Sequence, residues 1–307
     1  MGLFPRPIGG NAGAGRARLR PASSHATGIL LMLAAILGFT LMDATAKHLT
    51  QSYHPVQVVW ARFVGNLAIF AVIFRTAMPA LMRTRRPGLQ FSRALMQLGS
   101  VGLFFTALQH IGLAEATAIM DLNPVLITLG AALFLGERIG PRRMAGIAVA
   151  LVGAMLIIRP GLGVFQAAAL LPLAGAFTYA AGALLTRMAR TDSVATSVLW
   201  SAVVGSVITS AAVPAFWQPI RADDLWAFAL LGLFGTASQY LLVRAFATAE
   251  AGVLAPFGYT GLVWAGLWGW LLFGQLPDVW TVTGAAIIVA AGLYVWSREA
   301  RLARSAP

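Results

Sequence analysis

Residues 116–157 read ATAIMDLNPVLITLGAALFLGERIGPRRMAGIAVALVGAMLI. Two long apolar runs flank a short basic connection at 136–143. Each run has about the 20 residues that a helix needs to cross the hydrocarbon core of a bilayer. The runs are continuously apolar and do not alternate with polar residues, so membrane-spanning helices are predicted rather than the strands of a membrane barrel.

The composition of the whole chain agrees with lipid as the solvent. Of 307 residues, 59% are hydrophobic and only 10% are charged, whereas a soluble domain carries about a quarter charged residues. The net charge of +12 would suggest a nucleic-acid partner in a soluble protein. Here the charges fall in short gaps between apolar runs. The chain has no cysteine, which excludes a disulfide framework, a thiolate metal site and a cysteine nucleophile.

Ten apolar stretches long enough to span a membrane follow one another along the chain. We place them at 27–49, 55–77, 90–112, 115–136, 142–158, 165–187, 194–215, 224–246, 250–274 and 279–297. The gaps are too short to hold a soluble catalytic domain. Residues 1–25, rich in Gly, Pro and Arg, are predicted to be a disordered cytoplasmic tail, and 299–307 a second cytoplasmic tail.

Basic residues fall almost entirely on one side when alternate gaps are assigned to the same side. That side receives 18 of the 22 Lys and Arg residues. They are Arg6, Arg16, Arg18, Arg20, Arg75, Arg83, Arg85, Arg86, Arg93, Arg138, Arg142, Arg143, Arg187, Arg190, Arg244, Arg298, Arg301 and Arg304. Because positive residues mark the cytoplasmic face, the sequence predicts a multi-pass protein of the cytoplasmic (inner) membrane with both termini inside.

The two halves of the chain repeat each other. Phe39-Thr40 recurs as Phe177-Thr178, and Ala114-Glu115-Ala116 recurs as Ala249-Glu250-Ala251. Trp60 with Gly65 recurs as Trp200 with Gly205, and Gly136 with Gly146 recurs as Gly274 with Gly284. Five spans in each repeat, 26–160 and 161–298, mean that the second enters from the opposite side. We therefore predict two inverted five-helix repeats with a substrate site near the midplane between them, which is an architecture of alternating-access carriers.

The stretch quoted above also resembles a known family. Ala116, Pro124, Gly136-Glu137, Gly146 and Gly153 match the pattern of the drug/metabolite transporter superfamily, in particular proteins with two tandem EamA domains. The resemblance covers about residues 28–297 and includes amino-acid exporters of the YddG type. The second half departs from the pattern at Gln275, where glutamate is usual. The resemblance implies ten helices around a cavity, and substrates such as amino acids, S-adenosylmethionine, riboflavin, sugars or drugs.

Charged residues within the first two spans are candidate substrate ligands, since ionisable groups in lipid are costly and usually face a cavity. Asp43 and Lys47 share a helix face at i and i+4. They could bind a zwitterion, or form an internal salt bridge. Arg62 lies deep in the second span, where it could pair with Asp43 or Asp121 or clamp a carboxylate.

The fourth and ninth spans are predicted to carry helix kinks and further ligands. Pro124 and Pro256 interrupt them, and a broken backbone is tolerated only against protein or a wet cavity. The candidate substrate-binding residues here and in neighbouring spans are Asp121, Asn123, Tyr179, Gln239, Tyr240, Tyr259 and Trp264. Aromatic packing and a packing kink are the alternatives. No motif predicts a metal or a cofactor, and His48, His54 and His110 match no metal-site spacing.

A secondary carrier of small polar metabolites is the predicted function, with broad-specificity amino-acid export as the substrate assignment. A carrier of S-adenosylmethionine, riboflavin or cationic drugs is the alternative, because Tyr259 or Trp264 could hold a cation over a ring.

No P-loop, HExxH or GxSxG motif in a suitable context indicates an enzyme. A channel would need a continuous polar ring. Proton exchange at Asp43 or Asp121 and facilitated diffusion fit equally, and no oligomeric state follows from the sequence.

Overall fold

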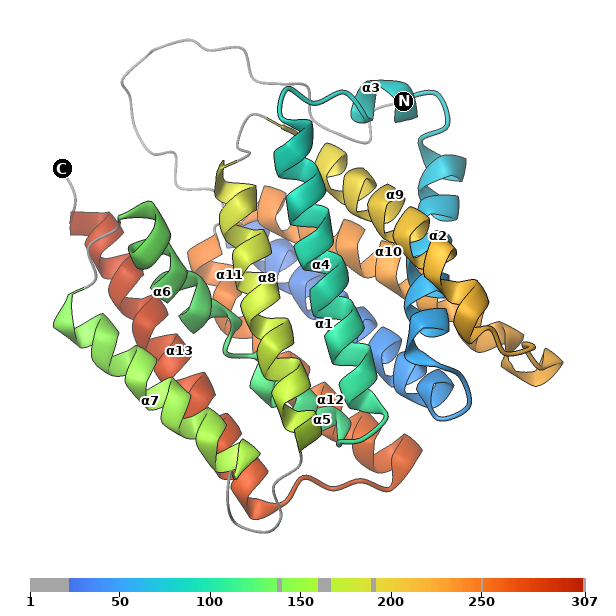
Figure 1. The fold of residues 1–307 in the computed structure, drawn as a ribbon. Coiled ribbons are helices and arrows are strands. Elements are labelled where there is room, and N and C mark those ends of the chain that lie inside the picture. The colour runs from blue at the N-terminus through green and yellow to red at the C-terminus, as the bar shows by residue number, and fades with distance from the viewer. Residues whose placement is uncertain (1–21, 137–139, 160–166, 189–191, 250, 306–307) are drawn as a thin grey trace.

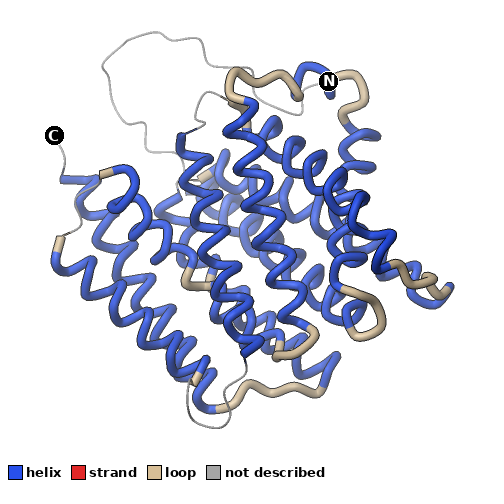
Figure 2. The backbone as a smooth tube through the Cα atoms, viewed as in Figure 1, coloured by secondary structure: helices blue, strands red, loops and turns tan. Residues whose placement is uncertain are grey.

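The computed structural model describes residues 22–136, 140–159, 167–188, 192–249 and 251–305. Within these ranges the protein is helical and contains no strand (Figure 2). The predicted N-terminal tail lies outside them as far as residue 21, as do Glu137, Arg138 and Glu250. The first helix begins at Ala22, and the last continues to Ser305, past the end predicted from the sequence.

The helices follow the order expected of two repeats (Figure 1). The first repeat contains α1 (Ala22–Thr50), α2 (Pro55–Ile73), the short α3 (Met78–Leu81), α4 (Pro87–Leu108), α5 (Leu113–Met120), α6 (Asn123–Leu135) and α7 (Pro141–Ile158). The second contains η1 (Ala167–Ala169), α8 (Leu170–Met188), α9 (Val194–Ala212), η2 (Val213–Phe216), η3 (Ala222–Asp224), α10 (Leu225–Thr248), α11 (Ala251–Gly258), α12 (Thr260–Phe273) and α13 (Val279–Ser305).

Most of these helices have the length and composition of membrane spans. Among the described residues, eight helical stretches are long and apolar enough to cross a membrane, and Met144–Ile158 is a shorter apolar helix. Large apolar side chains such as Val72, Phe134 and Val263 are exposed, as lipid-facing residues are. The chain has the architecture of a multi-pass membrane protein.

The predicted fourth and ninth spans are each divided into two helices. Asp121 and Leu122 separate α5 from α6, and Tyr259 separates α11 from α12. Pro124 lies in the first turn of α6, where proline needs no amide partner, whereas Pro256 lies inside α11. Both second halves end at a glycine in the left-handed region, Gly136 at φ 68° and Gly274 at φ 63°. A side chain is disfavoured there, so the repeats share the same helix ends.

Packing between the repeats follows the internal symmetry. Helix α1 packs along α10, and its counterpart α8 packs along α4. Two further pairs join counterparts directly, α2 with α9 and α7 with α13, the last pair lying side by side in Figure 1. Gly153 and Gly284 let α7 and α13 approach closely, because a Cβ on Gly153 would lie 2.8 Å from the Gly284 carbonyl oxygen.

The symmetry fails in the contacts that helices make across the middle of the molecule. Helix α1 packs against α4, and α5 packs against α12. Among the described residues no comparable packing joins their counterparts, α8 with α10 and α6 with α11. We call the side on which α1 and α4 end the closed side, and the other the open side. The helices around the middle of the molecule, α1 with α4 in the first repeat and α5 with α12 of the second, therefore pack tightly on one side of the membrane only.

Lys47 fixes the closed side. Its ammonium donates hydrogen bonds to the main-chain carbonyls of Leu108 (2.9 Å) and Ile111 (2.7 Å) at the end of α4, and the residue is 3% exposed. Helix ends leave carbonyls without partners, and a cation there also complements the helix dipole. Gln109 adds a hydrogen bond to the Thr50 carbonyl at 2.8 Å. The end of α1 is thereby joined to the end of α4.

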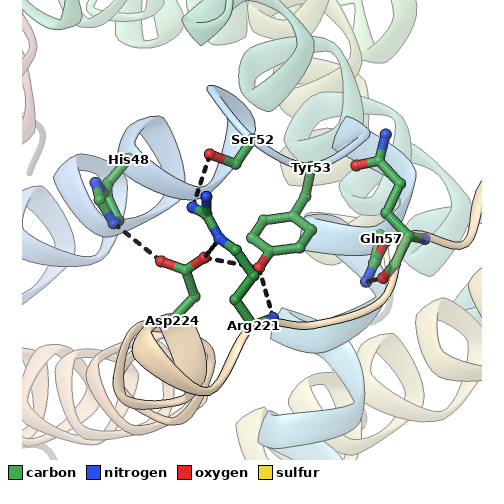
Figure 3. A network of polar contacts seen from close by, with 7 residues as sticks. His48, Ser52, Tyr53, Gln57, Arg221 and Asp224 are labelled. Atoms are coloured by element: carbon green, nitrogen blue, oxygen red, sulfur yellow. Dashed lines mark hydrogen bonds and ion pairs between the residues drawn. The ribbon is translucent and has the colours of Figure 1, made fainter.

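A second group of polar contacts on the closed side joins the α1–α2 connection to the α9–α10 connection (Figure 3). The Tyr53 hydroxyl donates to Asp224 Oδ2 (2.7 Å), and Arg221 Nε donates to the same oxygen (2.9 Å). The hydrogen bonds that Arg221 makes with Asp224 and with Tyr53 hold the pKa of Arg221 above its usual range. Gln57 exchanges two hydrogen bonds with the main chain of Gln218. The repeats are thus joined by specific bonds as well as by apolar packing.

An ion pair between Arg159 and Asp278 joins the end of α7 to the start of α13, with 2.6 Å between Nη2 and Oδ2. Burial raises the pKa of Asp278, but hydrogen bonds from Thr281 and the Arg159 guanidinium outweigh that effect and hold it below the usual range. The pair is partly exposed, so its contribution to stability is small.

Lys47→Met should weaken the closed side, because the carbonyls of Leu108 and Ile111 lose a charged donor that is worth about 2 kcal/mol. The chain has no cysteine, so a Val101→Cys reporter in the cavity described below can be labelled alone. We expect a membrane-impermeant maleimide added on the closed side to react several times faster in Lys47→Met. Leu185→Met, at the equivalent position of the second repeat, is the control. Equal rates in Lys47→Met and the parent would contradict the role given to Lys47.

Asp278 should make stability depend on acid pH. Because its folded pKa lies below the unfolded value of about 4, the stabilisation is present above that value and is lost as the pH falls through the folded pKa. Between about pH 5 and pH 3 we expect the melting temperature of detergent-solubilised Asp278→Asn to fall less than that of the parent protein. Parallel curves for variant and parent would show that the pair does not stabilise the protein.

Candidate functional site: a charged cavity between the repeats

A cavity of about 550 Å³ lies between the two repeats. Its wall is built from α1, α2, α4, α5, α6, α8, α9 and α10. It reaches the open side, since residues near the start of α4 and the end of α8, among them Arg93 and Thr186, line it. Five of the residues selected from the sequence line this cavity: Asp43, Arg62, Asn123, Tyr179 and Gln239.

Asp43 and Arg62 provide opposite charges from adjacent helices, α1 and α2. Each acts electrostatically on the other, although no direct ion pair joins them in the described residues. The Arg62 guanidinium lies over the rings of Phe63 (5.9 Å) and Phe105 (5.5 Å), and its Nε is buried without a hydrogen-bond partner. A buried unpaired donor costs free energy, so this site has binding capacity that the protein itself does not use.

Asn123 adds an unpaired acceptor at the break between α5 and α6. Its Oδ1 is buried and has no partner among the described residues, while the residue lines the cavity. The break exposes side chains of both short helices, because Thr117 of α5 and Met120 also line the wall. Polar groups from a discontinuous helix therefore face the cavity, as in many carriers.

The cavity also contains residues that the sequence reading did not select. On α4, Arg93, Gln97, Ser100 and Phe104 line it at helical spacing. Arg93 had been counted only as a cytoplasmic topology charge. A polar stripe at i, i+4 and i+7 was the signal that could have found these residues. Asn66 of α2 and Thr236 of α10 complete the polar wall, the Asn66 side-chain amide donating to Thr236 Oγ1 at 3.1 Å.

Five other predicted ligands lie elsewhere. Lys47 is bound to the end of α4 and does not line the cavity. Asp121 sits at the α5–α6 break with Oδ2 buried and unpaired, but it is absent from the cavity wall. Tyr240, Tyr259 and Trp264 are also absent from it. Trp264 stacks on Trp268 with ring centroids 6.2 Å apart, so its ring packs against protein.

A family model, described as the EamA-like transporter family, matches residues 26–159 and 166–297. The chain belongs to the EamA-like transporter family. Each matched segment coincides with one five-span repeat, so the two EamA repeats are the two halves that enclose the cavity. The protein is a small-molecule transporter and not an enzyme.

Relatives in this family have different cargoes. The chain is 32% identical to a riboflavin transporter of Rhizobium johnstonii, over 92% of the chain and 95% of that protein. It is 29% identical to the pseudopaline exporter CntI of Pseudomonas aeruginosa, over 86% and 94%. An S-adenosylmethionine uptake transporter of Rickettsia bellii is 24% identical, over 89% and 94%. A solved crystal structure has the same fold, with a TM-score of 0.62, 19% identity, and coverage of 90% of this chain and 99% of that one.

Removing one member of the Asp43–Arg62 pair should destabilise this EamA protein more than removing both. A single replacement leaves the other charge in the wall without its electrostatic partner, whereas Asp43→Asn with Arg62→Gln leaves none. Melting temperatures of the two single variants and the double variant form a double-mutant cycle. We expect a coupling of about 1 kcal/mol or more. Additive effects would mean that the two charges do not stabilise each other.

Proposed function

We propose that this EamA transporter carries small zwitterionic metabolites, with amino acids as the substrate class. The observation that carries the proposal is the opposite charges of Asp43 and Arg62 on one cavity wall, where Arg62 Nε has no partner. An amino acid offers an ammonium to Asp43 and a carboxylate to Arg62, and guanidinium–carboxylate contacts are among the stronger hydrogen bonds. Phe39, Phe70 and Phe104 supply apolar wall for a side chain.

Alternating access is the mechanism that the arrangement of the repeats supports. Exchanging the packing of the two halves would close the open side and open the closed side, as inverted repeats permit. A channel would instead need a continuous pore, and the Lys47 contacts and the α5–α12 packing close one end of the cavity. Transport by this route should be saturable and stimulated by substrate on the far side.

The orientation supports export from the cytoplasm. Basic residues gather on the side with the α2–α4 connection, which is the open side, and the positive-inside rule supports a cytoplasmic location for that side in an inner-membrane protein. A cavity open to the cytoplasm can load cytoplasmic metabolites. The direction of net flux then follows the substrate gradient, or a proton gradient if a cavity carboxyl exchanges a proton.

Riboflavin is the second candidate, favoured by a specific observation. Besides the 32% identity to a riboflavin transporter, the cavity wall includes Phe39, Phe63, Phe70 and Tyr179, against which a flat heterocycle could stack. S-adenosylmethionine is a weaker alternative, because Trp264 and Tyr259, the rings suited to its cation, do not line the cavity.

Counterflow in proteoliposomes separates these substrates. Purified protein would be reconstituted with a panel of radiolabelled amino acids, riboflavin and S-adenosylmethionine, with and without a pH gradient. We expect saturable, exchange-stimulated uptake of several amino acids, reduced at least tenfold in Asp43→Asn and Arg62→Gln. Arg75→Gln, an exposed residue outside the cavity wall, serves as the control for the loss of a basic residue. Uptake of riboflavin alone would overturn the amino-acid assignment, and flux without exchange stimulation would overturn the carrier mechanism.

A further inference from the structure

We propose that Arg93 forms an anion-binding subsite in the open half of the cavity, which takes the carboxylate of the substrate as it enters. The proposal rests on the transporter function proposed above and adds to it a residue that contacts the cargo. Arg93 lies on α4, and its guanidinium faces a cavity that the substrate must pass through to reach Arg62.

The guanidinium is held in place by three hydrogen bonds. Nε donates to Thr186 Oγ1 on α8, and Nη1 donates to the Ser197 carbonyl and to Ser201 Oγ on α9, all at 2.8 Å. Among the described residues no partner accepts from Nη2. A positioned guanidinium with two free N–H groups on one nitrogen can bind an oxyanion with little loss of side-chain entropy.

The charge of Arg93 is also unbalanced. No described carboxylate forms an ion pair with it, and the group that acts on it electrostatically is Tyr179, which lines the same cavity. Asp192, the acid near this end of α4, accepts hydrogen bonds from Thr84 and Gln90 instead. Arg62, by contrast, has Asp43. Among the charged residues that line the cavity, two arginines face one aspartate, so the cavity favours a substrate with an anionic group.

The subsite belongs to one repeat only. The position equivalent to Arg93 in the second repeat, at the same spacing of 138 residues that separates Gly136 from Gly274, is Leu231, which is fully buried. A charge kept only for the shared fold would be expected in both halves. The alternative is that Arg93 acts only as a topology charge. Charge-selective labelling and substrate competition separate the two roles.

Charge-selective labelling measures the subsite without knowledge of the substrate. A single Ala183→Cys reporter, one turn from Thr186 on α8 and also in the cavity wall, would react with an anionic and with a cationic methanethiosulfonate reagent. We expect Arg93→Gln to lower the ratio of the anionic to the cationic rate by roughly tenfold. Arg86→Gln is the matched control, because that exposed side chain donates to the Met188 carbonyl and lies outside the cavity wall. An unchanged ratio in Arg93→Gln overturns the subsite.

Competition then tests whether the subsite binds cargo. Uptake of radiolabelled L-leucine would be competed with unlabelled L-leucine or with L-leucinamide, which lacks the carboxylate. We expect the wild type to prefer leucine, and Arg93→Gln to raise KM about tenfold and to weaken that preference, since Arg62 still binds the carboxylate in the central site; Arg93→Lys should be intermediate. A KM and a preference both unchanged in Arg93→Gln would leave Arg93 as a topology charge only and overturn the proposal. If the wild type takes up no amino acid but the labelling ratio depends on Arg93, the amino-acid proposal fails and the anion subsite stands.

Discussion

The absence of water in the hydrocarbon core is the constraint on which this structure depends. Every main-chain polar group must find a partner within the protein, so the chain crosses the membrane as helices, and a broken helix is tolerated only where side chains or a wet cavity lie beside it. The two breaks, at Asp121–Leu122 and at Tyr259, occur at equivalent places in the repeats. The first brings Asn123 to the cavity, whereas at the second the Tyr259 hydroxyl packs against Gly292 of α13.

The same constraint explains why the charged side chains within the membrane lie at the closed side and at the cavity. An ionised side chain inside the membrane needs a partner or water. Lys47 finds its partners in the carbonyls at the end of α4, and this use of a charge closes one side of the protein. Asp43, Arg62 and Arg93 instead face the cavity, and the bonding capacity they keep is available to a cargo. Charged residues thus serve closure where protein lies opposite and, in the function that we propose, binding where the cavity lies opposite.

The inverted repeats account for a carrier with one open side. Helices α1 and α8, or α4 and α10, have the same place in their repeats, yet only the α1–α4 pair packs closely. A duplicated fold has two equivalent ways to pack its helices across the cavity, one on each side of the membrane, and specific polar contacts select one of them. Lys47 has no counterpart in the second repeat, where Leu185 stands. The side chains that differ between the halves therefore bias the conformation that the shared backbone permits.

The sequence by itself determined the spans, the repeat and the family, because apolar length and periodic similarity are properties of the chain read in order. It also selected Asp43, Arg62, Asn123, Tyr179 and Gln239, since a polar residue within an apolar run stands out without coordinates. Only the tertiary structure decided which way each side chain faces. Lys47, expected in the cavity, bonds the end of α4, and Arg93, expected only as a topology charge, lines the cavity. What lies opposite a side chain depends on contacts between segments distant in sequence, such as Arg93 with Ser197 and Lys47 with Leu108.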